Sequence, residues 1–469
     1  MNEFSLMING QRVAGGEGSF EVLNPATESV VAHCPQASVA QLNDAVAAAQ
    51  SCYESWQYSS DEERKTLLHK IADKIEEHAA ELAQIVVEEQ GKPMFLAQAE
   101  VGGAIAWTRA TADLEMPIDV LEDSEAKRVE VHRKPLGVVG SITPWNWPLM
   151  IAVWHIMPAI RSGNTVVSKP SGLTPLNTLR LVELINEVAP AGLVNVVTGE
   201  SGIGSGITKH PGIRKIVFTG STPTGQTIMR GAADNLKRLT LELGGNDAGI
   251  VLPDADPAAI AEAIFQTSFL NMGQTCAALK RLYVHDSIYE ELCERLADIA
   301  AQQNLGNGLE EGVTFGPVQN QDQFNLVNEL VEDAKANGAR ILAGGTPLEG
   351  KGYFYPPTIV ADISDGTRLV DEEQFGPVLP VIRYTDVEDA IKRANASEVG
   401  LGGSVWSSDS AKAADIATRL ECGTAWINGH AELLPYAPFG GCKMSGFGVE
   451  FGQEGLMEYT SAQVININK

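Results

Sequence analysis

Apolar residues recur at three- and four-residue spacing from residue 38 to residue 115. This spacing puts them on one face of a helix, so the pattern predicts helices over residues 39–51 and 61–90. Asp61 is the expected N-cap of the second helix, and the sequence Gly91-Lys92-Pro93 is expected to end it. Residues 117–135 alternate more, with Val129 and Val131 between charged neighbours, which predicts an exposed antiparallel ribbon.

From residue 136 onward, short apolar runs alternate with helical stretches. We expect buried strands at residues 137–142, 165–168, 194–197 and 215–218, and a helix over residues 175–189. A second region of this kind, from about residue 247 to 430, contains the expected strands 248–252, 281–285, 380–383 and 423–427. Such alternation is typical of βαβ units, in which helices cover both faces of a parallel sheet. The chain is therefore predicted to be an α/β protein with two such domains and a ribbon.

Length, composition and charge narrow the class of protein. A chain of 469 residues is too long for one core, which favours two or three domains. With 44% apolar and 20% charged residues, its composition is that of an ordinary soluble globular protein. The net charge of −26 would repel nucleic acid and anionic membranes, so neither is expected as a partner. The charge names no substrate, because excess acid can lie on a solvated surface.

Six cysteines are scattered along the chain: Cys34, Cys52, Cys276, Cys293, Cys422 and Cys442. None forms a Cys-x-x-Cys pair or clusters locally with histidine at metal-ligand spacing, so we expect no metal site. Scattered cysteines in a long chain fit a reducing compartment. The N-terminus shows no basic segment with a long apolar run, and no stretch approaches the roughly 20 apolar residues of a membrane span. We therefore expect a cytoplasmic protein.

Three segments carry residues suited to catalysis, and each also has an ordinary structural explanation. Cys276 follows a Gly-Gln-Thr turn that could present its sulfur in a cleft, whereas a lone cysteine is usually inert core. Glu242 lies between two leucines, and apolar surroundings raise the pKa of a carboxyl group toward values useful to a general base; the alternative is a strand-end glutamate facing solvent. Asn146 is at the centre of the sequence Pro-Trp-Asn-Trp-Pro, which would hold its amide rigid for an oxyanion hole or simply form a stiff turn.

Together these segments resemble the aldehyde dehydrogenase superfamily, and the resemblance covers essentially the whole chain. Cys276 follows Glu242 by 34 residues, which is the family's usual spacing. Further family segments appear in order: Lys169-Pro170-Ser171, Phe218-Thr219-Gly220-Ser221, Glu373-Gln374-Phe375-Gly376-Pro377, Pro438-Phe439-Gly440-Gly441 and Lys443-Met444-Ser445-Gly446.

The resemblance implies a non-acylating, NAD(P)-dependent dehydrogenase that oxidises an aldehyde to a carboxylic acid. By this resemblance, the Cys276 thiolate attacks the aldehyde carbon, and the Asn146 amide and the backbone N–H of Cys276 hold the resulting oxyanion. Glu242 then activates the water that hydrolyses the thioester.

The resemblance also implies a set of cofactor residues: Ile142, Thr143, Trp145, Lys169, Ser171, Gly172, Gly220, Ser221, Gly225, Leu243, Glu373 and Phe375. The Gly-x₄-Gly turn from Gly220 to Gly225 opens a helix whose free N–H groups can face pyrophosphate. Lys169 is expected at the adenosine ribose and Glu373 at the nicotinamide ribose, with Trp145 behind the cofactor. A capped turn and surface ion pairs are the structural alternatives.

Two positions depart from the family pattern. Family members that prefer NAD usually have glutamate where this chain has Gly172, so we expect use of both NAD and NADP. His155 stands where related enzymes often have a lysine that relays protons with a carboxylate matching Glu450. A packing histidine is the alternative for His155.

Positions matching the family's substrate tunnel are Trp147, Met150, Trp154, Leu270, Thr275, Leu433 and Phe439. None is lysine or arginine, which favours neutral aliphatic or aromatic aldehydes unless another loop supplies a charge.

The implied fold has two Rossmann-like parallel-sheet domains and a small antiparallel oligomerisation ribbon. Residues 1–115 and 136–244 would form the cofactor domain, 245–444 the catalytic domain, and 116–135 with 445–469 the ribbon and tail. The ribbon would join a partner's sheet in a homodimer or homotetramer.

Three other functions are less compatible with these residues. A CoA-acylating dehydrogenase typically lacks the base glutamate, a non-catalytic protein on this fold would not need Asn146, Glu242 and Cys276 together, and a cysteine hydrolase would need a histidine beside Cys276.

Overall fold

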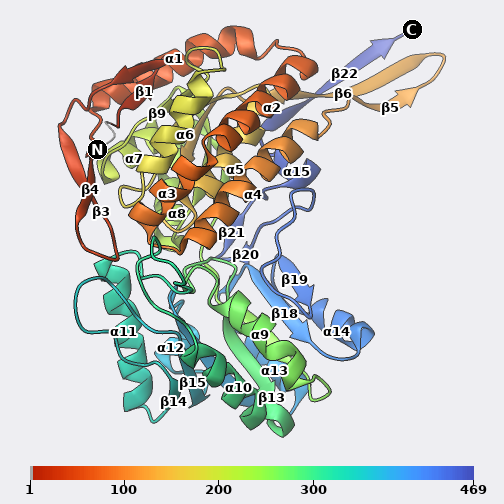
Figure 1. The fold of residues 1–469 in the computed structure, drawn as a ribbon. Helices are drawn as coiled ribbons and strands as arrows, with labels where there is room; N and C mark the ends of the chain where they lie inside the picture. Colours follow the sequence, from red (N-terminus) through yellow and green to blue (C-terminus); the bar gives the residue numbers. More distant parts are fainter. Residues whose placement is uncertain (1–3) are drawn as a thin grey trace.

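The computed structural model describes residues 4–469, which form two lobes and a projecting arm (Figure 1). The first lobe is built on an eight-stranded sheet with the order β2-β1-β9-β8-β7-β10-β11-β21. Its five central strands run parallel, and antiparallel strands close both edges. The strands are β1 (Leu6–Ile8), β2 (Gln11–Val13), β7 (Val138–Ile142), β8 (Thr165–Lys169), β9 (Val194–Val196), β10 (Ile213–Thr219), β11 (Arg238–Glu242) and β21 (Gly446–Phe447).

Helices cover both faces of this sheet. One face carries the apolar sides of α2 (Asp61–Glu77), α3 (Ala79–Gln90), α4 (Met94–Asp113), α5 (Pro148–Arg161) and α6 (Leu176–Asn186). The other carries α1 (Val39–Trp56), α7 (Ser201–Lys209) and α8 (Thr222–Ala232), and the short helix η1 (Ala233–Asn235) follows α8. This arrangement leaves the loops at the carboxyl ends of the parallel strands free to build a site.

The second lobe is built on a seven-stranded sheet with the order β14-β15-β16-β13-β12-β18-β19, parallel except for β14. Its strands are β12 (Asp247–Val251), β13 (Leu279–His285), β14 (Arg340–Ala343), β15 (Thr358–Ile363), β16 (Val378–Tyr384), β18 (Gly402–Trp406) and β19 (Thr424–Ile427). One face packs on α9 (Pro257–Ser268) and α10 (Tyr289–Ala301), with η2 (Asp286–Ile288) before α10. The other packs on α11 (Gln321–Ala336), α12 (Arg368–Asp371), α13 (Val387–Asn395) and α14 (Ser410–Ala417).

The arm is a three-stranded antiparallel sheet of β5 (Asp119–Asp123), β6 (Lys127–Pro135) and β22 (Thr460–Asn468), which extends away from both lobes (Figure 1). Two small pairings complete the structure: β3 (Ser19–Leu23) with β4 (Val30–Pro35), and β17 (Val399–Gly400) with β20 (Cys442–Lys443). Helix α15 (Gly452–Met457) leads into β22.

The predicted α/β class, with two mainly parallel sheets and an antiparallel ribbon, is confirmed. Some local expectations were wrong. The helix expected over residues 61–90 is two helices that break at His78, and its N-cap is Ser60, whose hydroxyl accepts from the Glu63 N–H in a capping box. Within the segment expected to be ribbon and tail, β21 pairs with β11 in the first sheet, while β22 belongs to the arm. The proposed domain boundaries themselves stay a prediction.

Across residues 4–469, no helix is long and apolar enough to cross a membrane.

Candidate active site

Residues from both lobes line one cavity. Segments that follow β7, β10 and β11 supply one side, and loops of the second lobe supply the other. The lining residues are Pro144, Trp145, Asn146, Thr219, Gly220, Ser221, Glu242, Leu243, Gly244, Cys276, Gln323, Glu373 and Phe375. The three predicted catalytic residues, far apart in the sequence, therefore meet at a single cavity.

Cys276 lies in the loop before β13, where a tight turn presents its thiol to the cavity. Asn271 and Met272 have φ values of 53° and 56°, and Gly273 has a φ of 71°. A Cβ atom on Gly273 would lie 2.1 Å from the main-chain oxygen of Gly376, so the turn requires glycine. Burial raises the pKa of the Cys276 thiol to about 12, against a lowering by Lys280. Without bound substrate or cofactor, Cys276 is therefore a thiol at neutral pH. A base must remove its proton before the sulfur can act as a nucleophile.

Glu242 ends β11 and places its carboxyl group in the cavity wall. The side chain is buried, and neither carboxylate oxygen has a hydrogen-bond partner among the described residues. Desolvation raises the pKa of this carboxyl well above its usual value, and Glu450 and Glu458 raise it further. A carboxyl group with a raised pKa and no partner is free to exchange a proton with a reacting group.

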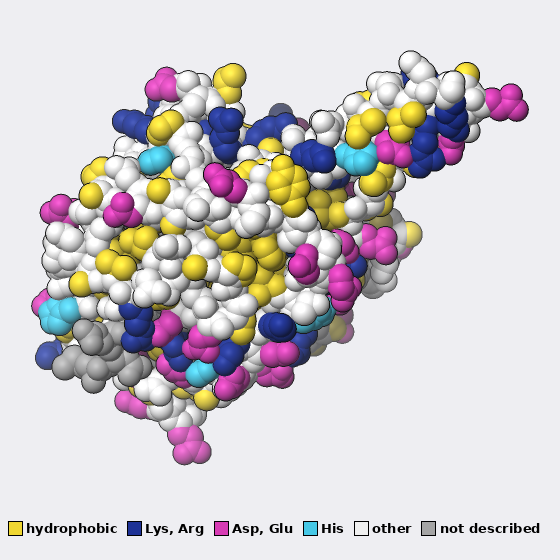
Figure 2. Space-filling model, turned by 90° about the horizontal axis from the view of Figure 1, so that it is seen from above, with side chains coloured by type: hydrophobic (Ala, Val, Ile, Leu, Met, Phe, Trp, Pro, Cys, Tyr) yellow, Lys and Arg dark blue, Asp and Glu magenta, His cyan; other side chains and the backbone are white. Residues whose placement is uncertain are grey.

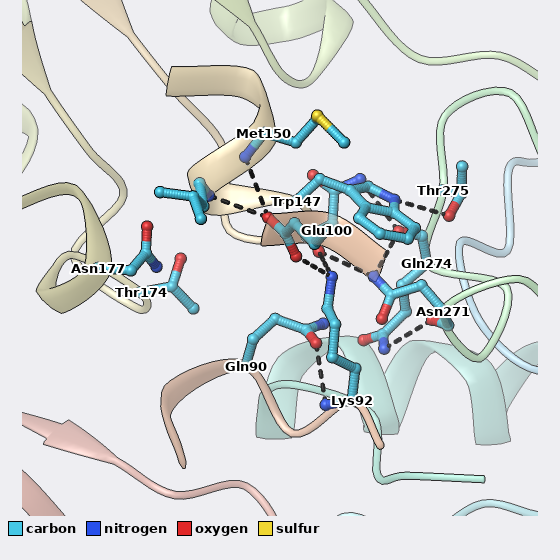
Figure 3. Close-up of polar contacts among 12 residues, drawn as sticks. Gln90, Lys92, Glu100, Trp147, Met150, Thr174, Asn177, Asn271, Gln274 and Thr275 are labelled. Atoms are coloured by element: carbon cyan, nitrogen blue, oxygen red, sulfur yellow. Dashed lines mark hydrogen bonds and ion pairs between the residues drawn. The ribbon is translucent and has the colours of Figure 1, made fainter. Parts of the chain in front are cut away.

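Asn146 is tied to the segment before Cys276. Its side-chain Nδ2 donates to the main-chain oxygen of Gln274 at 3.0 Å, which leaves the second N–H of the amide uncommitted by that bond. The neighbouring Trp147 donates its indole N–H to the Thr275 hydroxyl at 3.0 Å (Figure 3). These contacts fix the amide and the cysteine loop relative to each other, as an oxyanion hole requires.

His155 is fully buried on α5 and has a partner at each ring nitrogen. Nδ1 lies 3.1 Å from the Ser141 hydroxyl, while Nε2 lies 3.0 Å from the Thr219 hydroxyl and 3.2 Å from Oε1 of Glu450. A packing histidine needs a polar partner at each buried ring nitrogen, and His155 has them. Because Thr219 lines the cavity and Glu450 acts on the pKa of Glu242, they also put His155 next to the site, and a relay role stays a prediction.

A second hollow, between α7 and α8, adjoins two predicted cofactor residues, Ile142 and Lys169. Helix α8 begins after Ser221, and within the described part of the chain no side chain caps its N-terminus, so its first turn can meet a phosphate. A Cβ atom on Gly225 would lie 2.6 Å from Leu243, so glycine allows α8 to approach the sheet closely. Pro223 and Thr224, which also line this hollow, belong to the predicted Gly220–Gly225 turn. Sequence reasoning missed the rest of this lining: Gly202, Gly204, Ser205, Thr208, Lys209, Thr227, Ile228, Arg230, Gly231 and Asp234.

The two hollows together fit a dinucleotide. One offers a helix N-terminus and cations, and the other offers aromatic walls in which the rings of Trp145 and Phe375 meet edge to face with centroids 5.4 Å apart. Thr143 adds a buried hydroxyl without a partner among the described residues. Ser171 and Gly172 follow Lys169 by two and three residues but line neither hollow: the Ser171 hydroxyl accepts from the Leu173 N–H at 3.3 Å, and Gly172 lines a third hollow.

Lys280 is a site residue that sequence reasoning missed. Its ammonium lies 3.0 Å from a carboxylate oxygen of Glu373 and donates to the main-chain oxygen of Cys276. Glu373 also accepts from the Gly245 N–H at 3.2 Å, and a Cβ atom on Gly244 would lie 2.3 Å from that carboxylate. The only sequence signal for Lys280 is its position four residues after Cys276.

The predicted tunnel positions Trp154, Leu433 and Phe439 pack with Cys276 in one apolar cluster. Sequence reasoning missed Trp107, Trp426 and Phe451, which belong to the same cluster. The Phe451 ring lies edge-on to Trp154 with centroids 4.7 Å apart. Met150 lies against Gly103, where a Cβ atom would be 2.0 Å from its methyl group. Of the remaining positions, Trp147 bonds Thr275, and the Thr275 hydroxyl donates to the main-chain oxygen of Leu270 at 3.1 Å.

Among residues 4–469, no three His, Cys, Asp or Glu side chains gather where they could hold a metal ion.

The fold and the site together define a nicotinamide-dependent oxidoreductase. The chain belongs to the aldehyde dehydrogenase family, whose sequence model matches residues 13–465. A phenylacetaldehyde dehydrogenase of Pseudomonas fluorescens is 39% identical to it over 481 residues, which span 98% of this chain and 95% of the relative.

Solved structures agree with this assignment. The NAD⁺ complex of an aldehyde dehydrogenase from Bacillus cereus is similar with a TM-score of 0.97 at 38% identity, and covers 100% of this chain and 97% of that chain. An E. coli NADP-dependent enzyme is similar with a TM-score of 0.97 at 34% identity, and covers 100% of this chain and 98% of that chain.

Proposed function

We propose that this aldehyde dehydrogenase oxidises neutral aldehydes to free carboxylic acids through a covalent thioester on Cys276. The observation that carries the proposal is the convergence of Cys276, Glu242 and Asn146 on one cavity, where no side chain or main-chain group of residues 4–469 forms a hydrogen bond with the Glu242 carboxylate.

The first step adds the Cys276 sulfur to the aldehyde carbon. The thiol gives its proton to a base, the new C–S bond forms, and the carbonyl electrons move to oxygen, which becomes an anion. The Asn146 amide and the backbone N–H of Cys276 donate to this oxyanion. A nicotinamide held beside Trp145, Glu373 and Phe375 would supply the oxidising power as hydride acceptor, and loss of a hydride from the Cys276 adduct leaves a thioester.

Glu242 completes the reaction. Its carboxylate takes a proton from water, the water oxygen adds to the thioester carbon, and the C–S bond breaks with its electron pair on sulfur. The proton held by Glu242 then passes to that sulfur, so the acid leaves and the Cys276 thiol and the Glu242 carboxylate are restored. Desolvation raises the pKa of Glu242, which makes its carboxylate a stronger base than an exposed glutamate. The presence of Glu242 in the cavity favours water over CoA as the acyl acceptor.

The hollow beside Lys169 supports the use of both NAD and NADP. Lys169, Lys209 and Arg230 line it, against one acid, Asp234. These cations suit a 2′-phosphate, and Gly172 adds neither bulk nor charge that would repel one. The similarity to one NAD⁺ complex and one NADP-dependent enzyme agrees with this proposal.

The aromatic cluster supports an aromatic or long aliphatic substrate. Trp107, Trp154 and Phe451 pack ring against ring beside Cys276, and Phe439 stacks on Phe451. Apolar walls of this kind favour a substrate that brings its own apolar surface. The similarity to a phenylacetaldehyde dehydrogenase agrees with this choice.

The arm supports a homodimer or homotetramer. Exposed apolar side chains on β5 and β22, including Leu121 and Val464, lie among charged groups on the projecting arm (Figure 2). Such an edge is suited to pairing with a second copy of the chain.

Mass spectrometry of the Glu242→Gln variant tests the mechanism. After exposure to aldehyde and cofactor, the Cys276 peptide should carry an acyl group, because the thioester forms but hydrolyses slowly. Cys276→Ala should bind cofactor and oxidise nothing, whereas Cys293→Ala, in the core of the second lobe, should remain active. A Glu242→Gln enzyme that reduces cofactor in a burst but carries no acyl group would overturn the proposal.

A further inference from the structure

Lys92, which the sequence pattern assigns only to the end of a helix, is fully buried beside the segment that carries Asn146. Its ammonium contacts three groups: a carboxylate oxygen of Glu100 at 2.6 Å, the main-chain oxygen of Asn146 at 3.0 Å, and the face of the Trp147 ring at 3.6 Å (Figure 3). Two of these three contacts are to the consecutive residues Asn146 and Trp147.

Glu100, the partner of Lys92, also binds the chain just after Asn146. Its second carboxylate oxygen accepts the N–H groups of Leu149 and Met150, at 3.0 and 3.1 Å, in the first turn of α5. A carboxylate is favourable at a helix N-terminus, where N–H groups lack partners within the helix. The Lys92–Glu100 pair therefore binds main-chain groups both at Asn146 and in the first turn of α5.

A residue of the second lobe also contacts the main-chain oxygen of Asn146. The Asn271 side-chain amide donates to the main-chain oxygen of Asn146 at 2.8 Å, and the Asn146 amide donates to Gln274. The main-chain oxygen of Asn146 thus accepts from the loop that carries Cys276 on one side and from Lys92 on the other.

We propose that Lys92 is a positioning residue for catalysis: its ammonium fixes the backbone of Asn146 so that the side-chain amide points to where the oxyanion forms. This inference rests on the role of Asn146 in the proposed function. Lys92 itself is outside the cavity lining that contains Cys276.

Stability alone is a weak reason for this pair. A buried ion pair costs desolvation on both groups, and apolar side chains of similar volume are often as stable. An ammonium offers a directed donor to a main-chain oxygen that an apolar side chain cannot provide. Because the oxyanion is fully formed only in the transition state, a misplaced amide should lower kcat and kcat/KM together.

The test uses Lys92→Met, which keeps the length of the side chain and removes its charge. We expect kcat and kcat/KM for the aldehyde to fall by about tenfold or more, with the Kd of the cofactor unchanged. In an Asn146→Ala background, the same substitution should change kcat/KM by less than about threefold, because the group it positions is gone. A full loss on top of Asn146→Ala would overturn the inference.

Arg161→Met is the matched control for the loss of a buried charge. Arg161 is also fully buried; its guanidinium donates to the main-chain oxygens of Ala112 and Leu114, at 3.0 and 2.6 Å, and lies 2.6 Å from a carboxylate oxygen of Asp61, outside both cavity linings. We expect a lower Tm for this variant, with kcat of the folded enzyme within about twofold of the parent.

A double variant separates positioning from stability. Adding Glu100→Gln to Lys92→Met removes the unpaired carboxylate but keeps an acceptor for the α5 N–H groups, so the Tm should recover. If positioning is the role of Lys92, kcat stays low; recovery of kcat together with Tm overturns the inference. If Asn146→Ala alone retains full activity, the oxyanion role in the proposed function fails, and the inference fails with it.

Discussion

His155 and Glu450 meet in the interior of the first lobe, with Nε2 of the histidine 3.2 Å from a carboxylate oxygen of the glutamate. The same Glu450 raises the pKa of Glu242 in the cavity wall. Glu242, Glu450 and His155 therefore form a series of buried titratable side chains from the cavity into the protein interior. The charge of Glu450 changes the pKa of Glu242.

Glu450→Gln should move the acidic limb of the pH profile for thioester hydrolysis to lower pH. Glu242 acts as a base only when deprotonated, so activity rises with pH through its pKa. Desolvation is the main cause of the raised pKa and Glu450 the next, so removing the Glu450 charge lowers the pKa of Glu242. Steady-state kcat from pH 5 to 9 measures the shift, with the exposed Glu454→Gln as control. An unmoved limb would show that Glu450 does not act on Glu242.

Alkylation of Cys276 in the free enzyme should accelerate about tenfold per pH unit between about pH 6 and 9, because the thiolate is the reactive form. Its pKa of about 12 lies above this range, so the thiolate fraction keeps rising with pH. Lys280 lowers this pKa, so Lys280→Met should slow alkylation at every pH. Iodoacetamide labelling followed by peptide mass spectrometry gives the rates, with the buried Cys293 as an internal control. A plateau below pH 8 contradicts this prediction.

Phenylacetaldehyde should exceed succinate semialdehyde in kcat/KM by about a hundredfold, which corresponds to about 2.7 kcal/mol. Placing an unpaired carboxylate against Trp154, Phe439 and Phe451 costs more than the apolar walls return. Hexanal, which is neutral but not aromatic, separates the effect of charge from that of ring shape. A higher kcat/KM for the semialdehyde would reveal a cation at the tunnel.

Gly172→Glu should lower kcat/KM for NADP by about tenfold or more and leave NAD largely unaffected, because a carboxylate repels the 2′-phosphate. A side chain can begin at this position, since a Cβ atom there meets only the Phe20 ring, 3.7 Å away. Gly172→Gln is the control, with similar bulk and no charge. In the parent enzyme, a preference for NAD above about a hundredfold would falsify dual cofactor use.

The sequence alone determined the fold class and predicted which residues would meet at the central cavity. Short apolar runs between helical stretches predict parallel sheets, because a strand buried on both faces needs apolar residues along its whole length. The segments around Cys276, Glu242 and Asn146 carry a recognisable resemblance, and the structure brings all three to one cavity.

Tertiary structure decided what surrounds these residues. Lys92 lies 54 positions before Asn146 in the chain, and Trp107 and Phe451 are far apart in the sequence. The fold nevertheless brings these residues together around the site. No local pattern marks such contacts, because burial, pKa and hydrogen-bond partners depend on which elements pack together. The same lysine that looks like a helix stop in the sequence becomes, once α3, α4 and α5 have packed, a buried cation beside the Asn146 backbone.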